Sequence, residues 1–161
     1  MHRLALSALL VALLVPLLPL CAAAQAGSDS VQTMHISPAI GIHYGVPMRL
    51  SLAAGGLFDM RGRRNDGLVV MAEPGQSGTE ISLGYFRRHQ FGQGYSLRAA
   101  GIRTGDEPWN TSAHSTYLGV EAHWMLLAGV GGRAGWFRRV SGSYGDGLRD
   151  NLGTIGVSIG D

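Results

Sequence analysis

The amino-acid sequence predicts an all-β protein, an eight-stranded antiparallel up-and-down β-barrel preceded by a cleaved signal peptide. Three observations lead to this prediction. Segments in which apolar and polar residues alternate with period two follow one another along the chain, separated by short turns and loops rich in glycine and polar residues. No segment after the N-terminal apolar run has the 3.6-residue period of a helix. All 25 glycines lie beyond residue 26, and many fall on the polar face of a predicted strand, where they suit a narrow barrel.

The N-terminal segment has the three parts of a secretory signal peptide. It begins with the basic pair His2-Arg3, continues with an apolar run over residues 4–20, and ends with the small-x-small pattern Ala24-Gln25-Ala26. The apolar run is shorter than the roughly 20 residues that a membrane-spanning helix needs, and prolines interrupt it. We therefore expect residues 1–26 to be a signal peptide, cleaved after Ala24 or Ala26, and residues 27–161 to form one barrel domain.

The composition is unusual for a domain that folds in water. All 13 basic residues are arginine, and charged residues make up 15% of the chain, whereas about a quarter is usual. The net charge of +2 is too small to indicate a nucleic-acid partner. The single cysteine, Cys21, falls within the predicted signal peptide, so no disulfide is expected in the mature domain. An exported, glycine-rich and weakly charged chain is typical of a membrane barrel.

The first two strands are predicted at residues 33–44 and 48–56, where apolar side chains such as Ile42 alternate with small or polar ones such as His43. Pro38 falls on the apolar face of the first strand. A proline in a strand indicates an edge, a bulge or a strand end.

The third strand, at residues 68–72, is short and apolar and has no clean polar side. A polar loop is expected before it, at 59–67, and a turn after it, at 74–78. The fourth and fifth strands, at 79–87 and 95–103, alternate again.

The sixth strand, at residues 116–127, has the clearest alternation in the chain. Its apolar face carries Val120, and its other face carries Glu121 together with Gly119 in mid-strand. Because a glycine weakens a strand, its presence there indicates a close approach of a neighbouring backbone or side chain. We therefore take the second face to be the inside of a barrel.

The seventh and eighth strands are predicted at residues 130–140 and 151–160. Loops rich in polar residues precede the sixth and eighth strands, at 104–113 and 141–150. Short connections make the order a meander, and closing a meander into a barrel removes its exposed edges.

Alternation alone leaves open which face points inward. An inward apolar face would make a soluble, lipocalin-like calyx for a hydrophobic ligand. An outward apolar face would make a membrane barrel with a narrow polar interior, and three features favour it. The polar face is rich in glycine, alanine and serine, its few charges have both signs and can pair internally, and aromatic residues gather near strand ends on the apolar face. The predicted interior polar network consists of Glu80, Glu121, Arg49, Arg98, Arg133 and His123.

With these features, residues 33–159 resemble the small eight-stranded outer-membrane barrels of the OmpA and OmpX kind. The resemblance is one of pattern and not of a specific motif. The closing run from Gly153 to Gly160 looks like the last strand of such proteins, which normally ends in an aromatic residue, and this chain has Asp161 there. The resemblance implies an outer-membrane location.

Three pairs of arginines lie in or beside predicted connections. Solvated loop charge is one interpretation of them. Contact with anionic lipid headgroups or lipopolysaccharide phosphates at the barrel rims is the functional one. The predicted rim residues are Arg63, Arg64, Arg87, Arg88, Arg138 and Arg139.

Catalytic and metal chemistry find little support in the sequence. His114-Ser115 with Glu121 is the one local group with the residue types of a hydrolytic site. His114 and Ser115 would point to opposite faces of a strand, and Glu121 would lie about 20 Å from Ser115 on a straight strand. The His-x-Ser-Asn run of the lipid A deacylases is also missing. The histidines do not have the spacing of a metal site, so we expect no catalytic residue, metal or cofactor.

The sequence therefore predicts a small outer-membrane β-barrel with a structural or surface-interaction role. Its interior should be polar and plugged, without an open pore, because eight strands leave room only for side chains. The alternative is a soluble periplasmic or secreted lipocalin-like barrel that binds a small hydrophobic ligand, and a third reading is a lipid-modifying outer-membrane enzyme. We expect a monomer that contacts outer-membrane lipid or lipopolysaccharide and no nucleic acid.

Overall fold

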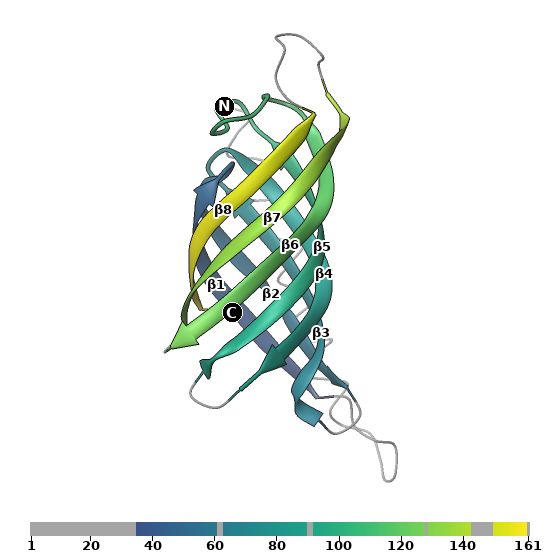
Figure 1. Ribbon diagram of the computed structural model, residues 1–161, viewed down its shortest axis with the longest axis vertical. Coiled ribbons are helices and arrows are strands. Elements are labelled where there is room, and N and C mark those ends of the chain that lie inside the picture. Colours follow the sequence, from purple (N-terminus) through teal and green to yellow (C-terminus); the bar gives the residue numbers. More distant parts are fainter. Residues whose placement is uncertain (1–34, 61–62, 90–91, 128, 143–149, 161) are drawn as a thin grey trace, which may run out of the picture. The chain divides into compact units, whose positions relative to one another are not determined.

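The structure is a computed structural model that describes residues 35–60, 63–89, 92–127, 129–142 and 150–160 (Figure 1). The predicted signal peptide lies outside the described residues. So do the side chains of Met60, Arg63, Arg64 and Leu127.

Eight antiparallel strands form a closed barrel in chain order, as the sequence predicts (Figure 1). Each strand pairs with its neighbours along the chain, and the last pairs with the first. The strands are β1 (Ile36–Val46), β2 (Arg49–Met60), β3 (Arg63–Gly75), β4 (Gly78–Arg88), β5 (Gly94–Thr104), β6 (Thr116–Leu127), β7 (Val130–Ser141) and β8 (Asn151–Gly160).

The antiparallel order gives the barrel two distinct ends. We call the end with the β1–β2, β3–β4, β5–β6 and β7–β8 connections the loop end. We call the other the terminal end, because β1 begins and β8 finishes there, beside the remaining three connections.

The predicted bounds of one loop and one strand are wrong. The sequence predicts a polar loop at 59–67 and a short strand at 68–72, but β2 and β3 form one long hairpin in which Asp59 pairs with Gly67. The loop was inferred from polar composition, whereas ladder hydrogen bonds use the backbone and do not depend on side-chain polarity. Asp66 also pairs with Arg87 on β4 and accepts a hydrogen bond from the Tyr85 hydroxyl at 3.1 Å. These contacts hold the polar segment in the sheet.

The outer surface of the barrel is apolar on every strand. Side chains at alternate positions point outward, as barrel geometry requires, and these are the large apolar residues. We call this surface the apolar belt. Its members are Ile40, Ile42, Leu52, Leu68, Val70, Ile81, Leu83, Leu97, Leu118, Val120, Trp136, Ile155, Val157 and Ile159.

The inner surface is more varied than the small, polar face predicted from the sequence. One buried apolar cluster comes from β1 to β4 and includes Leu57, Val69 and Phe86. A second comes from β5 to β8 and includes Tyr117 and Phe137. Buried charged and polar residues occupy the rest of the interior. Eight strands enclose a space that side chains can fill, so the barrel has a packed core.

The connection between β5 and β6, residues 105–115, covers part of the loop end. The Gly105 amide donates to the Ser77 carbonyl at 2.7 Å, and the Trp109 amide donates to the Pro47 carbonyl at 3.1 Å. Met48, in the β1–β2 turn, is fully buried. The connection therefore joins three hairpins of the loop end.

Gly119 on β6 has the close approach that the sequence predicts. A Cβ added there would collide with the carbonyl oxygen of Trp136 and the Cα of Phe137 on β7. Gly153 on β8 is a matched contrast, since an added Cβ would meet no atom within 4 Å.

We expect Gly119→Ala to destabilise the barrel by about 1–3 kcal/mol, because the added methyl group forces a shift of backbone. Gly153→Ala should change the stability by no more than about 0.5 kcal/mol. Urea titration of the two variants, refolded in detergent, measures the difference. Equal effects would mean that β6 and β7 are not this close at Gly119.

Pro38 lies where β1 has a partner on one side. It pairs with Gly56 on β2, whereas the pairing of β1 with β8 covers Gly41–Val46 and, within the described residues, does not reach Pro38. A proline has no amide hydrogen to donate, so this edge segment tolerates it. Of the edge, bulge or strand end that the sequence leaves open for Pro38, the described residues show an edge.

Candidate functional site

The guanidinium of Arg133, on β7, lies at the centre of a buried group of charges. Its Nη1 is 2.7 Å from Glu73 Oε2 and 3.8 Å from Glu80 Oε2, and its Nε is 3.4 Å from Glu121 Oε1. The arginine side chain is 1% exposed and its three partners are at most 3% exposed. One cation therefore joins carboxylates from β3, β4 and β6 across the barrel interior.

Two histidines complete this group. His43 Nδ1, on β1, is 2.7 Å from Glu73 Oε2, and His123 Nε2, on β6, is 3.4 Å from Glu121 Oε2. The two imidazole rings are 5.6 Å apart between centroids. The Ser51 hydroxyl donates to the second oxygen of Glu73. We call the six ionisable residues the charged cluster: His43, Glu73, Glu80, Glu121, His123 and Arg133.

The cluster contains groups of both charge signs. Three carboxyl groups face one guanidinium, and two imidazoles can each carry a further proton. A buried charge is tolerated where oppositely charged and hydrogen-bonding groups surround it. Each carboxyl group has at least one basic neighbour: Arg133 for Glu73 and Glu80, and His123 for Glu121. The cluster can therefore fix the relative positions of the strands that contribute to it.

Five of the six residues of the predicted interior network are buried inside the barrel. Glu80, Glu121, Arg133 and His123 belong to the cluster. Arg98 is also buried, at 4% exposure, and its Nε donates to Ser96 Oγ at 2.9 Å. It pairs with Glu121 in the β5–β6 register.

Arg49 is a correction to the predicted network. It lies at the first position of β2 with a φ of 61°, and its guanidinium stacks over the Trp109 ring at 5.5 Å from the ring centre. The period-two pattern assigns it to the inner face, but the left-handed backbone at the β1–β2 turn breaks that period. Arg49 therefore contacts the 105–115 connection at the loop end.

Two members of the cluster were absent from the predicted network. Glu73 falls between the strand predicted at residues 68–72 and the turn predicted at 74–78, so the sequence prediction gives it no face. In the structure β3 continues to Gly75, and Val69, Met71 and Glu73 all point inward. The spacing of two residues from Val69 to Met71 to Glu73 was the sequence signal that could have placed Glu73 on the inner face. His43 was assigned to the polar lining from its face but was given no partner.

The one local group with hydrolytic residue types is not assembled. Glu121 contacts Arg133 and His123 in the interior. His114, with a φ of 52°, forms an exposed pair with Asp106 at 3.3 Å. The Ser115 hydroxyl is buried and donates to the Ala113 carbonyl.

The predicted rim arginines occupy different environments. Arg138 is exposed near the loop end, whereas Arg87 is exposed and Arg88 half-buried near the terminal end. Arg63 and Arg64 begin β3, and their side chains lie outside the described residues. Arg139 is a correction: its guanidinium is buried, 2.7 Å from Asp150 Oδ1, and donates to Ser112 Oγ at 3.3 Å. Its alternation points it inward, where it joins two loops of the loop end.

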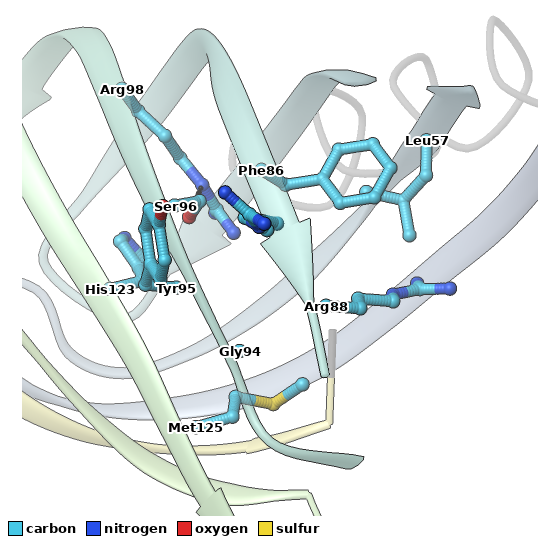
Figure 2. Close-up of a pocket in the computed structure, with 10 residues that line it drawn as sticks. Leu57, Phe86, Arg88, Gly94, Tyr95, Ser96, Arg98, His123 and Met125 are labelled. Carbon is cyan, nitrogen blue, oxygen red and sulfur yellow. Dashed lines mark hydrogen bonds between the residues drawn. The ribbon is translucent and has the colours of Figure 1, made fainter. Parts of the chain in front are cut away.

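A small recess lies at the terminal end, between β2, β4, β5 and β6 (Figure 2). Its volume is about 30 Å³. Arg87, Arg88, Arg98 and His123 line it together with Ser96 and several apolar side chains. We call it the basic recess. His123 belongs to both the basic recess and the charged cluster.

Over the described ranges, no three histidine, cysteine or acidic side chains are arranged to hold a metal ion. No helix in the same ranges is long and apolar enough to cross a membrane. No protein-family model matches the chain, and no curated protein or solved structure shows significant similarity to it.

Proposed function

We propose that the chain is a small outer-membrane β-barrel with a structural or surface-interaction role and a closed interior. The observation that carries the proposal is the apolar belt. Monomeric proteins in water rarely expose contiguous apolar patches larger than a few hundred Å², whereas this belt includes exposed large apolar side chains on all eight strands. A bilayer is the environment in which such a surface is stable.

The interior argues against the lipocalin-like alternative. A calyx needs an apolar cavity for its ligand. Here Arg133, Glu80 and Glu121 occupy part of the inside with charged groups that bind one another. A hydrophobic ligand would have to displace these ion pairs.

The two ends of the barrel differ as they do in outer-membrane barrels, which have short periplasmic turns and longer outer loops. The two longest connections by residue number, 105–115 and 142–150, join strands whose ends are at the loop end. The proposal therefore places the loop end outside and the terminal end on the periplasmic side. Lipid or lipopolysaccharide is the proposed partner, and the proposed unit is a monomer without a cofactor.

Cell fractionation tests the location. The full chain, expressed in a Gram-negative host, should be recovered with outer membranes and should need detergent for extraction. The folded barrel should also migrate differently on a gel before and after heating. Recovery in the periplasmic fraction without detergent would refute the membrane proposal.

The closed interior leads to a separate expectation. Because buried side chains fill the barrel, the refolded chain should produce no ion-conducting steps above background in a planar lipid bilayer. Stable, repeated conductance steps would show that the charged cluster does not close the barrel.

A further inference from the structure

We propose that Arg49, Tyr44 and Trp109 form a binding site for the phosphate of a lipid headgroup at the loop end of the barrel. We call these three residues the Arg49 site. The proposal rests on the membrane location proposed above, because a membrane is what places headgroups at the edge of the apolar belt. The site gives the proposed lipid partner a place on the barrel and a chemical group by which it is recognised.

Arg49 is the cation of the site. Among the described residues, no acidic side chain lies within ion-pair distance of its guanidinium. Its Nε is buried and has no hydrogen-bond partner in the same part of the chain. The acidic residues of the 105–115 connection lie elsewhere, since Asp106 pairs with His114 and Glu107 is exposed. A half-buried cation of this kind is stabilised by an anion that enters its surroundings.

The backbone holds Arg49 in a conformation that favours glycine. Its φ is 61°, in the left-handed region where other residues are uncommon. At the first position of β2, this backbone turns the side chain to the Trp109 ring, where the guanidinium lies 5.5 Å from the ring centre. Residues with such backbones cluster at ligand-binding sites, where the surrounding structure fixes them. The guanidinium is therefore in position before a ligand arrives, so binding has few further groups to order.

Two aromatic rings connect the guanidinium to the apolar belt. Trp109 meets the Tyr44 ring edge-on, with 5.5 Å between the ring centres. Tyr44 is 51% exposed on β1 and pairs with Val157 of the apolar belt, on β8. Tyrosine and tryptophan are enriched at membrane interfaces, because one end of each side chain is apolar and the other is polar. The site therefore lies where a bound lipid changes from headgroup to hydrocarbon.

A phosphate group fits the Arg49 site better than the other parts of a lipid do. A guanidinium presents planar N–H donors that match phosphate oxygens, and stacking of its face on a ring leaves its edge for them. A cationic headgroup such as choline would be repelled by Arg49. The acyl chains have an apolar surface beside the site, since Ile42 of the apolar belt is two residues from Tyr44 along β1. The expected ligand is an anionic lipid whose phosphate is not shielded by a cation.

Native mass spectrometry of the full chain, refolded in nonionic detergent, tests the ligand. The probes are dioleoyl phosphatidic acid, dioleoylglycerol, which has the same chains without the phosphate, and inorganic phosphate. We expect one phosphatidic acid to bind at least about tenfold more tightly than dioleoylglycerol, the ratio expected for a charge-assisted hydrogen bond. Inorganic phosphate should bind more weakly than the lipid, because it makes no contact with the apolar belt. Equally tight binding of inorganic phosphate would identify a free-anion site and overturn the lipid proposal.

A matched pair of variants locates the binding. Arg49→Gly removes the charge and suits the left-handed backbone, so the variant should fold and should lose about tenfold or more in affinity for phosphatidic acid. Arg103→Gln removes the same charge from an exposed position of β5 near the loop end and should leave the affinity within about twofold. Trp109→Leu keeps the charge but removes the ring beneath it, and should weaken binding by about two- to fivefold. Arg49→Gln replaces Arg49→Gly if the glycine alters the turn.

Equal losses in Arg49→Gly and Arg103→Gln would overturn the site, because they would show a general effect of net charge. Binding of dioleoylglycerol as tight as that of phosphatidic acid would overturn it as well. A chain that fractionates with outer membranes but shows no preference for phosphatidic acid would refute the site and leave the location intact. A chain recovered from the periplasm without detergent would refute the location on which the site depends.

Discussion

Replacing Arg133 by methionine should destabilise the barrel by about 3–5 kcal/mol, the cost typical of breaking a buried ion pair from one side. Methionine keeps much of the volume of the arginine chain but removes the charge. Glu73, Glu80 and Glu121 then remain in the interior without the guanidinium that each of them faces. Urea titration of the variant and the unmodified chain, both refolded in detergent, measures the change. Arg103→Met, at an exposed position, is the control and should stay within about 0.5 kcal/mol.

Double-mutant cycles identify which carboxylates depend on the cation. Arg133→Met combined with Glu121→Gln, and separately with Glu73→Gln, should cost less than the sum of the single changes, with a coupling above about 0.5 kcal/mol in each cycle. The shorter contact, to Glu73 at 2.7 Å, should give the larger coupling. Additivity in both cycles would contradict the arrangement of the charged cluster.

Leu83→Arg should destabilise the barrel by about 2–4 kcal/mol when stability is measured in phospholipid vesicles, which is the cost of an arginine near the bilayer midplane. Leu83 lies midway along β4 and is 55% exposed. In a soluble protein an arginine at such an exposed position changes stability by no more than about 0.5 kcal/mol. The substitution therefore distinguishes the membrane proposal from the soluble alternative.

Val140→Arg provides the control for depth. Val140 is as exposed as Leu83 but lies one residue from the end of β7. Its replacement should cost about 0–1 kcal/mol, because the penalty falls towards the membrane interface. Small and equal costs at both positions would contradict the membrane location.

Alternation predicted the fold well because each barrel strand must divide its side chains between two environments. The predicted bounds of β6 and β8 agree with the structure, and the inward position of Glu121 follows from its neighbours Val120 and Ala122. The pattern was less informative where strands end. Pro74-Gly75 has the composition of a turn, so the prediction ended the strand before Glu73, whereas β3 continues to Gly75. At Arg49 the left-handed backbone interrupts the alternation, so the pattern gives no reliable face for this residue.

The contacts of the charged cluster could be predicted only in part from the pattern. Alternation states which face a residue occupies, but not how the strands are staggered around a closed barrel. That stagger brings His43, near the loop end of β1, to Arg133, near the terminal end of β7, where Arg133 Nη1 and His43 Nδ1 are 3.2 Å apart. The ion pair of Arg139 could not be predicted from alternation either, because its partner Asp150 lies in a connection and not in a strand.

The seam between β1 and β8 has a consequence for the order of folding. Every other pair of strands is adjacent in the chain, so it can form as a hairpin with a small loss of chain entropy. The seam joins Gly41–Val46 to residues near the opposite end of the chain, and such non-local pairing is slow. We therefore expect closure to be the last step in assembly of the barrel. Until it occurs, the edges of β1 and β8 remain open to pairing with other strands.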